Sequence, residues 1–122
     1  MPVETRDPRS FLPLTPLVFQ VLLALADADR HGYGIIREVA ERTDGLITLR
    51  TGTLYTLLQR LLDEGLLEKP TRRPAAGEDD ERRRYYRLTP LGRGVLHAEA
   101  RRLESLIGEA RRKRVLGRSS RA

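Results

Sequence analysis

Leucines recur with a helical period along the middle of the chain. In RTGTLYTLLQRLLDEGLLEK, residues 50–69, five of them follow the spacing i, i+3, i+4, i+7 and i+8: Leu54, Leu57, Leu58, Leu61 and Leu62. This spacing predicts an amphipathic helix, with Thr51 or Thr53 as its N-cap and Gly65 at its end. The opposite face of this helix carries the polar side chains Thr53, Thr56, Gln59, Arg60 and Asp63.

Two further helices are predicted before this one. Thr15 and Pro16 form a cap and first-turn pair ahead of LVFQVLLALADA, residues 17–28, which is apolar on nearly every side. Such a helix must be covered all round, by its own domain or by a second subunit. HGYG then leads into IIREVAERTDG, residues 35–45, where Gly45 suits the helix end. LITL, residues 46–49, fits a short strand or an extended connector.

The hydrophobic period changes after the leucine-striped helix. LLEKPTR, residues 66–72, and RRRYYRLT, residues 82–89, each have the pattern of a strand, and the segment between them has the composition of a hairpin tip. Tyr86 shares a strand face with Leu88 and is expected to point inward. Thr89 and Pro90 repeat the cap-then-proline start before a last helix predicted to run to about Leu116. This order predicts a mainly α fold with a small β-hairpin, a winged helix-turn-helix.

The last helix carries a regular apolar seam. Steps of four and three residues separate its members Leu96, Ala100, Leu103, Ile107 and Ala110. A helix projecting beyond a small winged domain needs a partner for such a seam, so we predict a homodimer, with Leu17 and Val21 of the first helix as further interface residues. The alternative is a helix folded back on its own domain. The expected divisions are a winged domain over residues 14–89, a dimerisation helix over 90–116 and a basic, disordered tail over 117–122.

Charge is distributed unevenly along the 122 residues, a length that suits one compact domain. The first 100 residues contain 15 basic and 15 acidic side chains, whereas residues 101–122 contain 8 basic and 2 acidic ones. The whole net charge of +6 therefore lies in the C-terminal segment. That segment is either a solvated helix face with a frayed end or a phosphate contact, so net charge alone does not establish DNA binding.

Several classes of protein are excluded by what the chain lacks. It has no cysteine, and hence no disulfide or thiolate zinc site. The polar N-terminus is unlike a signal peptide, and the longest apolar run is too short to span a bilayer, so we expect a soluble cytoplasmic protein with no membrane partner. His31 and His97 are far apart, no phosphate-binding G-x-x-x-x-G-K loop occurs, and Glu78–Glu81 fits a solvated charge run. We predict no enzyme, metal or cofactor.

Three motifs together resemble a known family. They are HGYGI at residues 31–35, TGTLYTLLQRLLDEGLLE at residues 51–68 and RRRYYRLTPLG at residues 82–92. From about Leu14 to the final helix the chain resembles the PadR-like transcriptional regulators, whose signature couples a G-x-LY-x-x-L-x-x-L helix to a basic Y-Y-x-L-T strand. The chain departs from that pattern at Thr56, where the family usually has proline, and at the acidic tip Glu78–Glu81, where the wing is normally basic.

The winged helix-turn-helix order predicts which residues contact DNA. A recognition helix lies in the major groove with its N-terminal exposed side chains at the base edges, while flanking groups bind phosphates. The candidates are Arg50, Thr51, Thr53, Tyr55, Thr56, Gln59, Arg60, Arg72, Arg73, Arg82, Arg83 and Arg84. The alternatives are that Gln59 and Arg60 are ordinary exposed helix formers, that Tyr55 only borders the core, and that the hairpin arginines pair with the acidic tip.

The resemblance also implies how such a protein works. It implies a dimeric, sequence-specific repressor that binds a double-stranded DNA operator, joins its subunits through terminal helices and is released by a small, often aromatic or drug-like, effector. A different class of function remains open, in which the winged domain serves protein association and its arginines only confer solubility. Binding to specific DNA separates the two.

Overall fold

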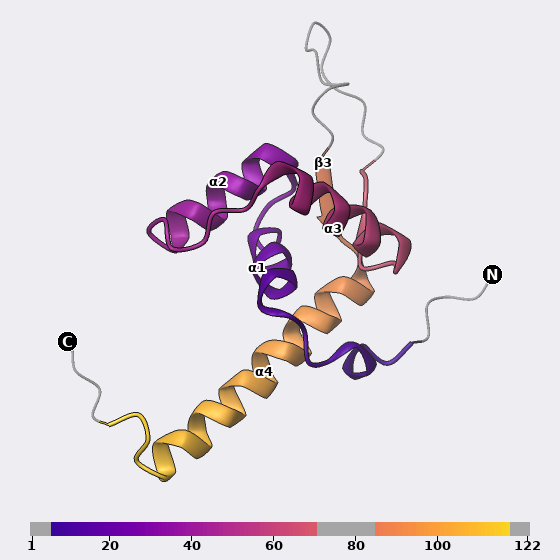
Figure 1. The fold of residues 1–122 in the computed structure, drawn as a ribbon. Helices are drawn as coiled ribbons and strands as arrows, with labels where there is room; N and C mark the ends of the chain where they lie inside the picture. Colours follow the sequence, from indigo (N-terminus) through magenta and orange to yellow (C-terminus); the bar gives the residue numbers. More distant parts are fainter. Residues whose placement is uncertain (1–5, 71–84, 118–122) are drawn as a thin grey trace, which may run out of the picture.

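The computed structural model describes residues 6–70 and 85–117, which form four α-helices, one short 3-10 helix and three short strands (Figure 1). In chain order they are η1 Pro8–Phe11, α1 Pro16–Ala24, β1 Arg30–His31, α2 Gly32–Arg42, α3 Thr51–Asp63, β2 Leu67–Glu68, β3 Tyr85–Leu88 and α4 Pro90–Arg112. This is the mainly helical winged helix-turn-helix that the sequence predicted. Within the described ranges no helix is long and apolar enough to cross a bilayer.

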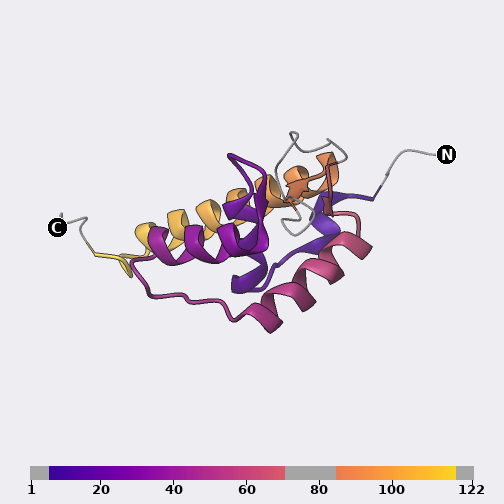
Figure 2. The same cartoon turned by 90° about the horizontal axis from the view of Figure 1, so that it is seen from above.

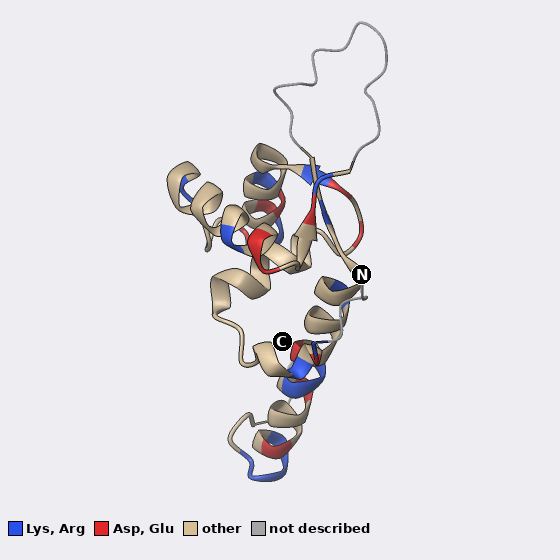
Figure 3. Ribbon diagram, turned by 90° about the vertical axis from the view of Figure 1, so that its right-hand side faces the viewer, with Lys and Arg blue, Asp and Glu red and all other residues tan. Residues whose placement is uncertain are grey.

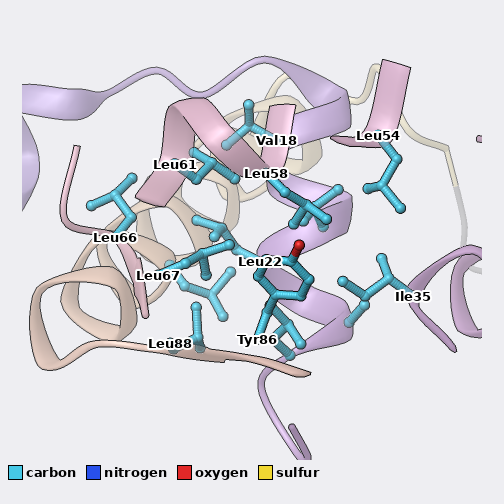
Figure 4. Packing of buried hydrophobic residues seen from close by; sticks show 14 of the residues in the cluster. Val18, Leu22, Ile35, Leu54, Leu58, Leu61, Leu66, Leu67, Tyr86 and Leu88 are labelled. Carbon is cyan, nitrogen blue, oxygen red and sulfur yellow. The ribbon is translucent and has the colours of Figure 1, made fainter. Parts of the chain in front are cut away.

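The core surrounds α1. This helix lies at the centre, with α2, α3 and α4 around it (Figure 1), and the view from above places α3 and α4 on opposite sides of it (Figure 2). Its apolar side chains meet the leucines of α3 and the inner face of the sheet, as Figure 4 shows for Leu22, Leu58 and Tyr86. Tyr86 is buried, as predicted, and its strand neighbour Tyr85 is exposed.

The first helix is shorter than its apolar run. It ends at Ala24 rather than continuing to residue 28, because the chain turns to place β1 against β3. The Arg30 Nε donates to the carbonyl oxygen of Ala24 (2.7 Å), which satisfies a group that the helix end leaves without an intrahelical partner. Thr15 caps the start as predicted, its hydroxyl oxygen accepting from the backbone N–H of Val18 (3.2 Å).

Strand β1 was not predicted. Its two residues, Arg30 and His31, pair antiparallel with Tyr86 and Tyr85, and β2 pairs with the other edge of β3, giving the sheet order β1-β3-β2. The strand lies between two helices and is too short to show alternation. By contrast, the LITL segment is an extended connector without strand pairing, one of the two conformations expected for it.

The ends of the other helices show which sequence signals for helix caps are correct and which are wrong. Thr89 caps α4 as predicted, its hydroxyl oxygen accepting from the Gly92 N–H (2.9 Å). Gly65 ends α3 as predicted, at φ +82°. The predicted N-caps Thr51 and Thr53 are wrong, since the cap of α3 is Arg50, which makes no side-chain cap hydrogen bond.

Helix α4 stops at Arg112 rather than near Leu116. Arg114 adopts the left-handed conformation at φ +61°, and the Val115 N–H donates to the Ala110 carbonyl (2.9 Å). This is the hydrogen bond that closes a Schellman cap. The outer half of α4 projects away from the rest of the domain (Figure 1).

The chain before Leu14 also packs on the domain. Helix η1 lies against α4, and a Cβ placed on Gly94 would be 3.1 Å from Pro8 Cγ. The Arg6 guanidinium donates to the Glu64 carbonyl at the end of α3. The packed chain therefore extends N-terminal of the predicted winged domain, because a polar segment can dock through a few apolar rings and backbone hydrogen bonds.

Candidate nucleic-acid interface

Helix α3 turns one face to the core and the other to solvent. Its buried leucines are Leu54, Leu58 and Leu61. Thr51, Thr53, Thr56, Gln59 and Arg60 are all exposed. The leucine stripe thus fixes the helix so that the side chains predicted to contact DNA form its outer surface.

The N-terminal end of α3 is open to solvent. Its first turn has no acidic residue, and Gly52 has open space where a Cβ would stand. Within the described residues, no carboxylate pairs with Arg50. The helix N-terminus also carries a partial positive charge, so hydroxyls, a guanidinium and backbone N–H groups face solvent together. This combination of donors suits phosphates and base edges.

The C-terminal half of the same face is different, because its polar side chains pair with each other. Gln59 Nε2 donates to Asp63 Oδ1 (3.0 Å), and Arg60 Nε lies 3.7 Å from Glu64 Oε2. Both are i, i+4 pairs at the surface. Sequence spacing did not single out these pairs, although glutamine four residues before aspartate on an exposed helix face is a known stabilising combination.

Tyr55 joins the two helices of the helix-turn-helix. Its side chain is 43% exposed, and its ring lies across the start of α2, where a Cβ on Gly32 would be 2.2 Å from the Tyr55 hydroxyl oxygen. Glycine at position 32 is what permits this approach. Tyr55 therefore packs at the edge of the core, while contact of its hydroxyl with DNA stays a prediction.

His31 was not predicted as a structural residue, although it holds this junction together. Its Nδ1 accepts from the Gly34 N–H (3.0 Å) and so caps α2, which begins at Gly32 rather than after HGYG. The His31 ring also meets Tyr85 of β3 edge-on, with centroids 5.4 Å apart. The start of α2 is thereby tied to the wing strand. The sequence signal for this cap was a polar residue directly before G-x-G, but histidine is not among the usual N-cap residues.

Tyr33 is a second residue that the sequence did not lead us to predict. It is 64% exposed in the first turn of α2, beside the junction of α2, α3 and the wing strand. An exposed aromatic with a hydroxyl is typical of a contact surface. The signal was the tyrosine inside HGYG, which was read only as part of the entry to a helix.

The wing is described only at its base. Arg87 of β3 pairs with Glu68 of β2, Nε to Oε2 at 3.0 Å, so this cation is matched by a carboxylate. The predicted DNA-contacting residues Arg72, Arg73, Arg82, Arg83 and Arg84, and the acidic tip Glu78–Glu81, lie outside the described residues.

The predicted dimer residues fall into two groups. Val21 is 0% exposed and Leu96 is 7% exposed within a single chain, so both belong to the core of the domain and not, as predicted, to a dimer interface. The seam continues into the core because the first turns of α4 pack on the domain. The others keep accessible surface: Leu17, Ala100, Leu103, Ile107 and Ala110.

The outer half of α4 also carries Leu106, which was not predicted. Leu106 and Ile107 are each 45% exposed. Beyond them the helix ends at Arg111 and Arg112, and Lys113 and Arg114 follow directly, where Figure 3 shows blue ribbon at the lower end of the molecule. The projecting helix thus presents an apolar seam followed by a basic end.

A buried carboxylate fixes α4 against the chain entering α1. Glu99 is 1% exposed. Its oxygens accept from Arg102 Nε (2.6 Å) and Nη2 (3.0 Å) and from the Leu14 N–H (3.2 Å). The hydrogen bonds from Arg102 lower the pKa of Glu99, against the opposing effect of burial.

Replacing Glu99 by Gln should therefore destabilise the protein in a pH-dependent way. At neutral pH we expect a loss of about 1.5–3 kcal/mol in the free energy of unfolding, the usual worth of hydrogen bonds to a charged group. The folded-state pKa is depressed, so the contribution is complete above the unfolded value and disappears as pH falls through the folded one. Urea unfolding at a series of pH values checks this, with the exposed Glu104→Gln as control. A difference independent of pH would contradict it.

Comparison with known proteins shows the family. A family model described as the transcriptional regulator PadR-like family matches residues 21–98, more than half of the chain. The chain belongs to the PadR-like family. Membership places this PadR-like protein among DNA-binding transcriptional regulators and not among enzymes, in agreement with the motif-based prediction.

Individual relatives agree with this PadR-like assignment. Transcriptional regulator Rv3488 of Mycobacterium tuberculosis is 36% identical over 89 residues, which are 73% of this chain and 77% of that protein. The hsRosR-S4 complex structure is 30% identical with a TM-score of 0.64, covering 89% of this chain and 90% of that one. Bacillus subtilis PadR, solved in complex with operator DNA, shares the fold at 24% identity and a TM-score of 0.58, over 70% of this chain and 46% of that one.

Proposed function

We propose that the protein is a homodimeric repressor that binds a double-stranded DNA operator, with α3 of each subunit in the major groove. The observation that carries the proposal is the outer face of α3, where the N-terminal end presents Arg50 beside Thr51 and Thr53. Among the residues that the structure describes, Arg50 has no carboxylate partner. Backbone donors and the Arg50 guanidinium there suit phosphates and guanine, and Gln59 further along suits adenine.

The dimer is part of the proposal because an operator is read as two half-sites by two-fold symmetric proteins. Its interface comprises the accessible residues of the α4 seam, Ala100, Leu103, Ile107 and Ala110, with Leu17 of α1. The added surface of Leu106 fits the same role. Relief of repression by a small aromatic or drug-like effector is part of the proposal on the ground of the family resemblance.

Replacing Arg50 or Gln59 by Ala should change which bases the protein prefers. Each lost base pairing is expected to cost about 1–3 kcal/mol against the preferred base pair and little against others. Selection from random double-stranded DNA identifies the operator, and competition titrations with single base-pair variants then measure each preference. Equal weakening on all sequences would make the two residues phosphate contacts. A protein that selects no sequence would leave protein association as its function.

Replacing Arg82 and Arg83 by Ala tests the predicted wing. Binding should weaken similarly on all sequences, and the slope of log affinity against log salt should decrease by about one for each lost phosphate contact. Titrations at several salt concentrations measure the slope. Neutralising Glu78–Glu81 should tighten binding, chiefly at low salt. An unchanged slope in the arginine variant would show that the acidic residues, not DNA, occupy those guanidinium groups.

A further inference from the structure

The Gln59 amide is held in one orientation by Asp63. Its Nε2 donates to Asp63 Oδ1 (3.0 Å) one helical turn further along the exposed face of α3. A carboxylate has no proton to give, so the amide nitrogen and not Oε1 must face it. The chemistry of the pair therefore fixes which end of the amide points toward Asp63.

This orientation leaves a defined edge for a ligand. The amide has two N–H groups, and Asp63 engages one. The negative carboxylate of Asp63 repels Oε1 of Gln59. Donation to Asp63 is therefore favoured for the N–H group that points away from Oε1. The free edge then holds one donor beside one acceptor. In the major groove adenine presents the complementary pair, the N7 acceptor and the N6 donor, whereas guanine presents two acceptors.

We propose that Asp63 is a positioning residue that sets the preference for adenine at the base pair read by Gln59. The inference rests on the proposed function, because it requires α3 to lie in the major groove. Asp63 is not itself suited to contact the DNA backbone, since its charge repels phosphates. The Asp63 carboxylate is thus expected to lower the affinity for all DNA and to raise the preference for adenine. These two effects can be measured separately.

The neighbouring pair shows why Gln59 is the side chain affected. Arg60 lies 3.7 Å from Glu64 through Nε, beyond hydrogen-bonding distance, and a guanidinium has only donors. The pairing of Arg60 with Glu64 therefore cannot determine whether Arg60 presents a donor or an acceptor to a base. Of these two side chains, Gln59 alone has an amide with two different ends, so an orienting carboxylate changes the base that fits at Gln59 and not at Arg60.

Asp63→Ala is the test, compared with Gln59→Ala and with the double variant. The base pair concerned is the one whose preference Gln59→Ala removes. There, Asp63→Ala should lower the discrimination of adenine over guanine about threefold, the usual effect of freeing one polar side chain at an interface. It should also tighten binding to unrelated duplex DNA. Competition titrations on duplexes differing at that base pair provide the first measurement, and direct titration of unrelated duplex the second.

The double variant separates positioning from charge. If Asp63 acts through Gln59, adding Asp63→Ala to Gln59→Ala should change base preference no further, yet should still tighten binding to unrelated duplex. Asp63→Glu keeps a carboxylate at the same turn and should restore most of the preference. Because Asp63 is exposed, these variants should fold normally, which circular dichroism checks.

Each outcome has a distinct meaning. If Asp63→Ala leaves the preference unchanged while the wild type selects a motif, this inference alone is overturned. An equal shift in the Gln59→Ala background overturns it too, because Asp63 would then act through charge. If the wild type selects no motif, or Gln59→Ala alters no preference, the proposed function or the reading role of Gln59 is wrong and the inference falls with it.

Discussion

Replacing Leu103 and Ile107 together by Asp should produce a folded monomer that binds its operator on the order of 100-fold more weakly than the wild type. In the proposed two-fold interface each substitution would place like charges opposite one another and remove them from water. Each monomer keeps α3, so non-specific DNA affinity should decrease less than operator affinity.

The structure explains the choice of these two positions. Both lie on the projecting half of α4, and Ile107 is 45% exposed in a single chain. Leu96 belongs to the same seam but is buried in the domain core. A charge at Leu96 would unfold the monomer and reveal nothing about the dimer.

Sedimentation velocity and operator titration measure the outcome together. A matched control is Arg101→Ala with Ser105→Asp, which changes the net charge by the same amount at two exposed positions on the other side of α4. That variant should remain dimeric and keep its operator affinity apart from a modest salt-dependent loss. A Leu103→Asp, Ile107→Asp protein that is folded, dimeric and fully active would place the interface elsewhere.

Replacing Gly92 by Ala should destabilise the domain by about 3 kcal/mol, at the upper end for an overpacked site. A Cβ at this position would stand 2.0 Å from the carbonyl oxygen of Leu66, which also accepts from the Thr89 N–H (3.1 Å). The obstacle is backbone and is held in place, so it cannot swing aside. The first turn of α4 would have to move away from the end of α3.

Thermal and urea unfolding measure this loss, which should lower the midpoint temperature by roughly 12 °C or more. Gly52→Ala is the control, because a Cβ there meets nothing within 4 Å, and an alanine in a helix is more stable than a glycine by up to about 1 kcal/mol. If both variants were equally stable, the contact of α4 with the α3–β2 junction would not be as tight as described.

Patterns that depend on local chemistry were readable from the sequence. The leucine stripe of α3 predicted both the helix and its exposed face, because helical periodicity sorts side chains by burial. Thr15 and Thr89 marked helix starts, since a hydroxyl before proline satisfies a free backbone N–H. Tyr86 was placed inward because strand residues alternate. Together with the family motifs, these signals were enough to predict a PadR-like winged helix-turn-helix.

The features that tertiary structure decided all involve partners distant in sequence or choices between equivalent partners. A two-residue strand at Arg30 and His31 exists only because β3 pairs with it, and Gly92 is required only because Leu66 lies against it. A heptad seam has the same spacing whether it packs on its own domain or on a second subunit. Sequence therefore predicted that the seam on α4 is buried, and only the fold could separate Leu96, inside the domain, from Ile107, still exposed on one chain.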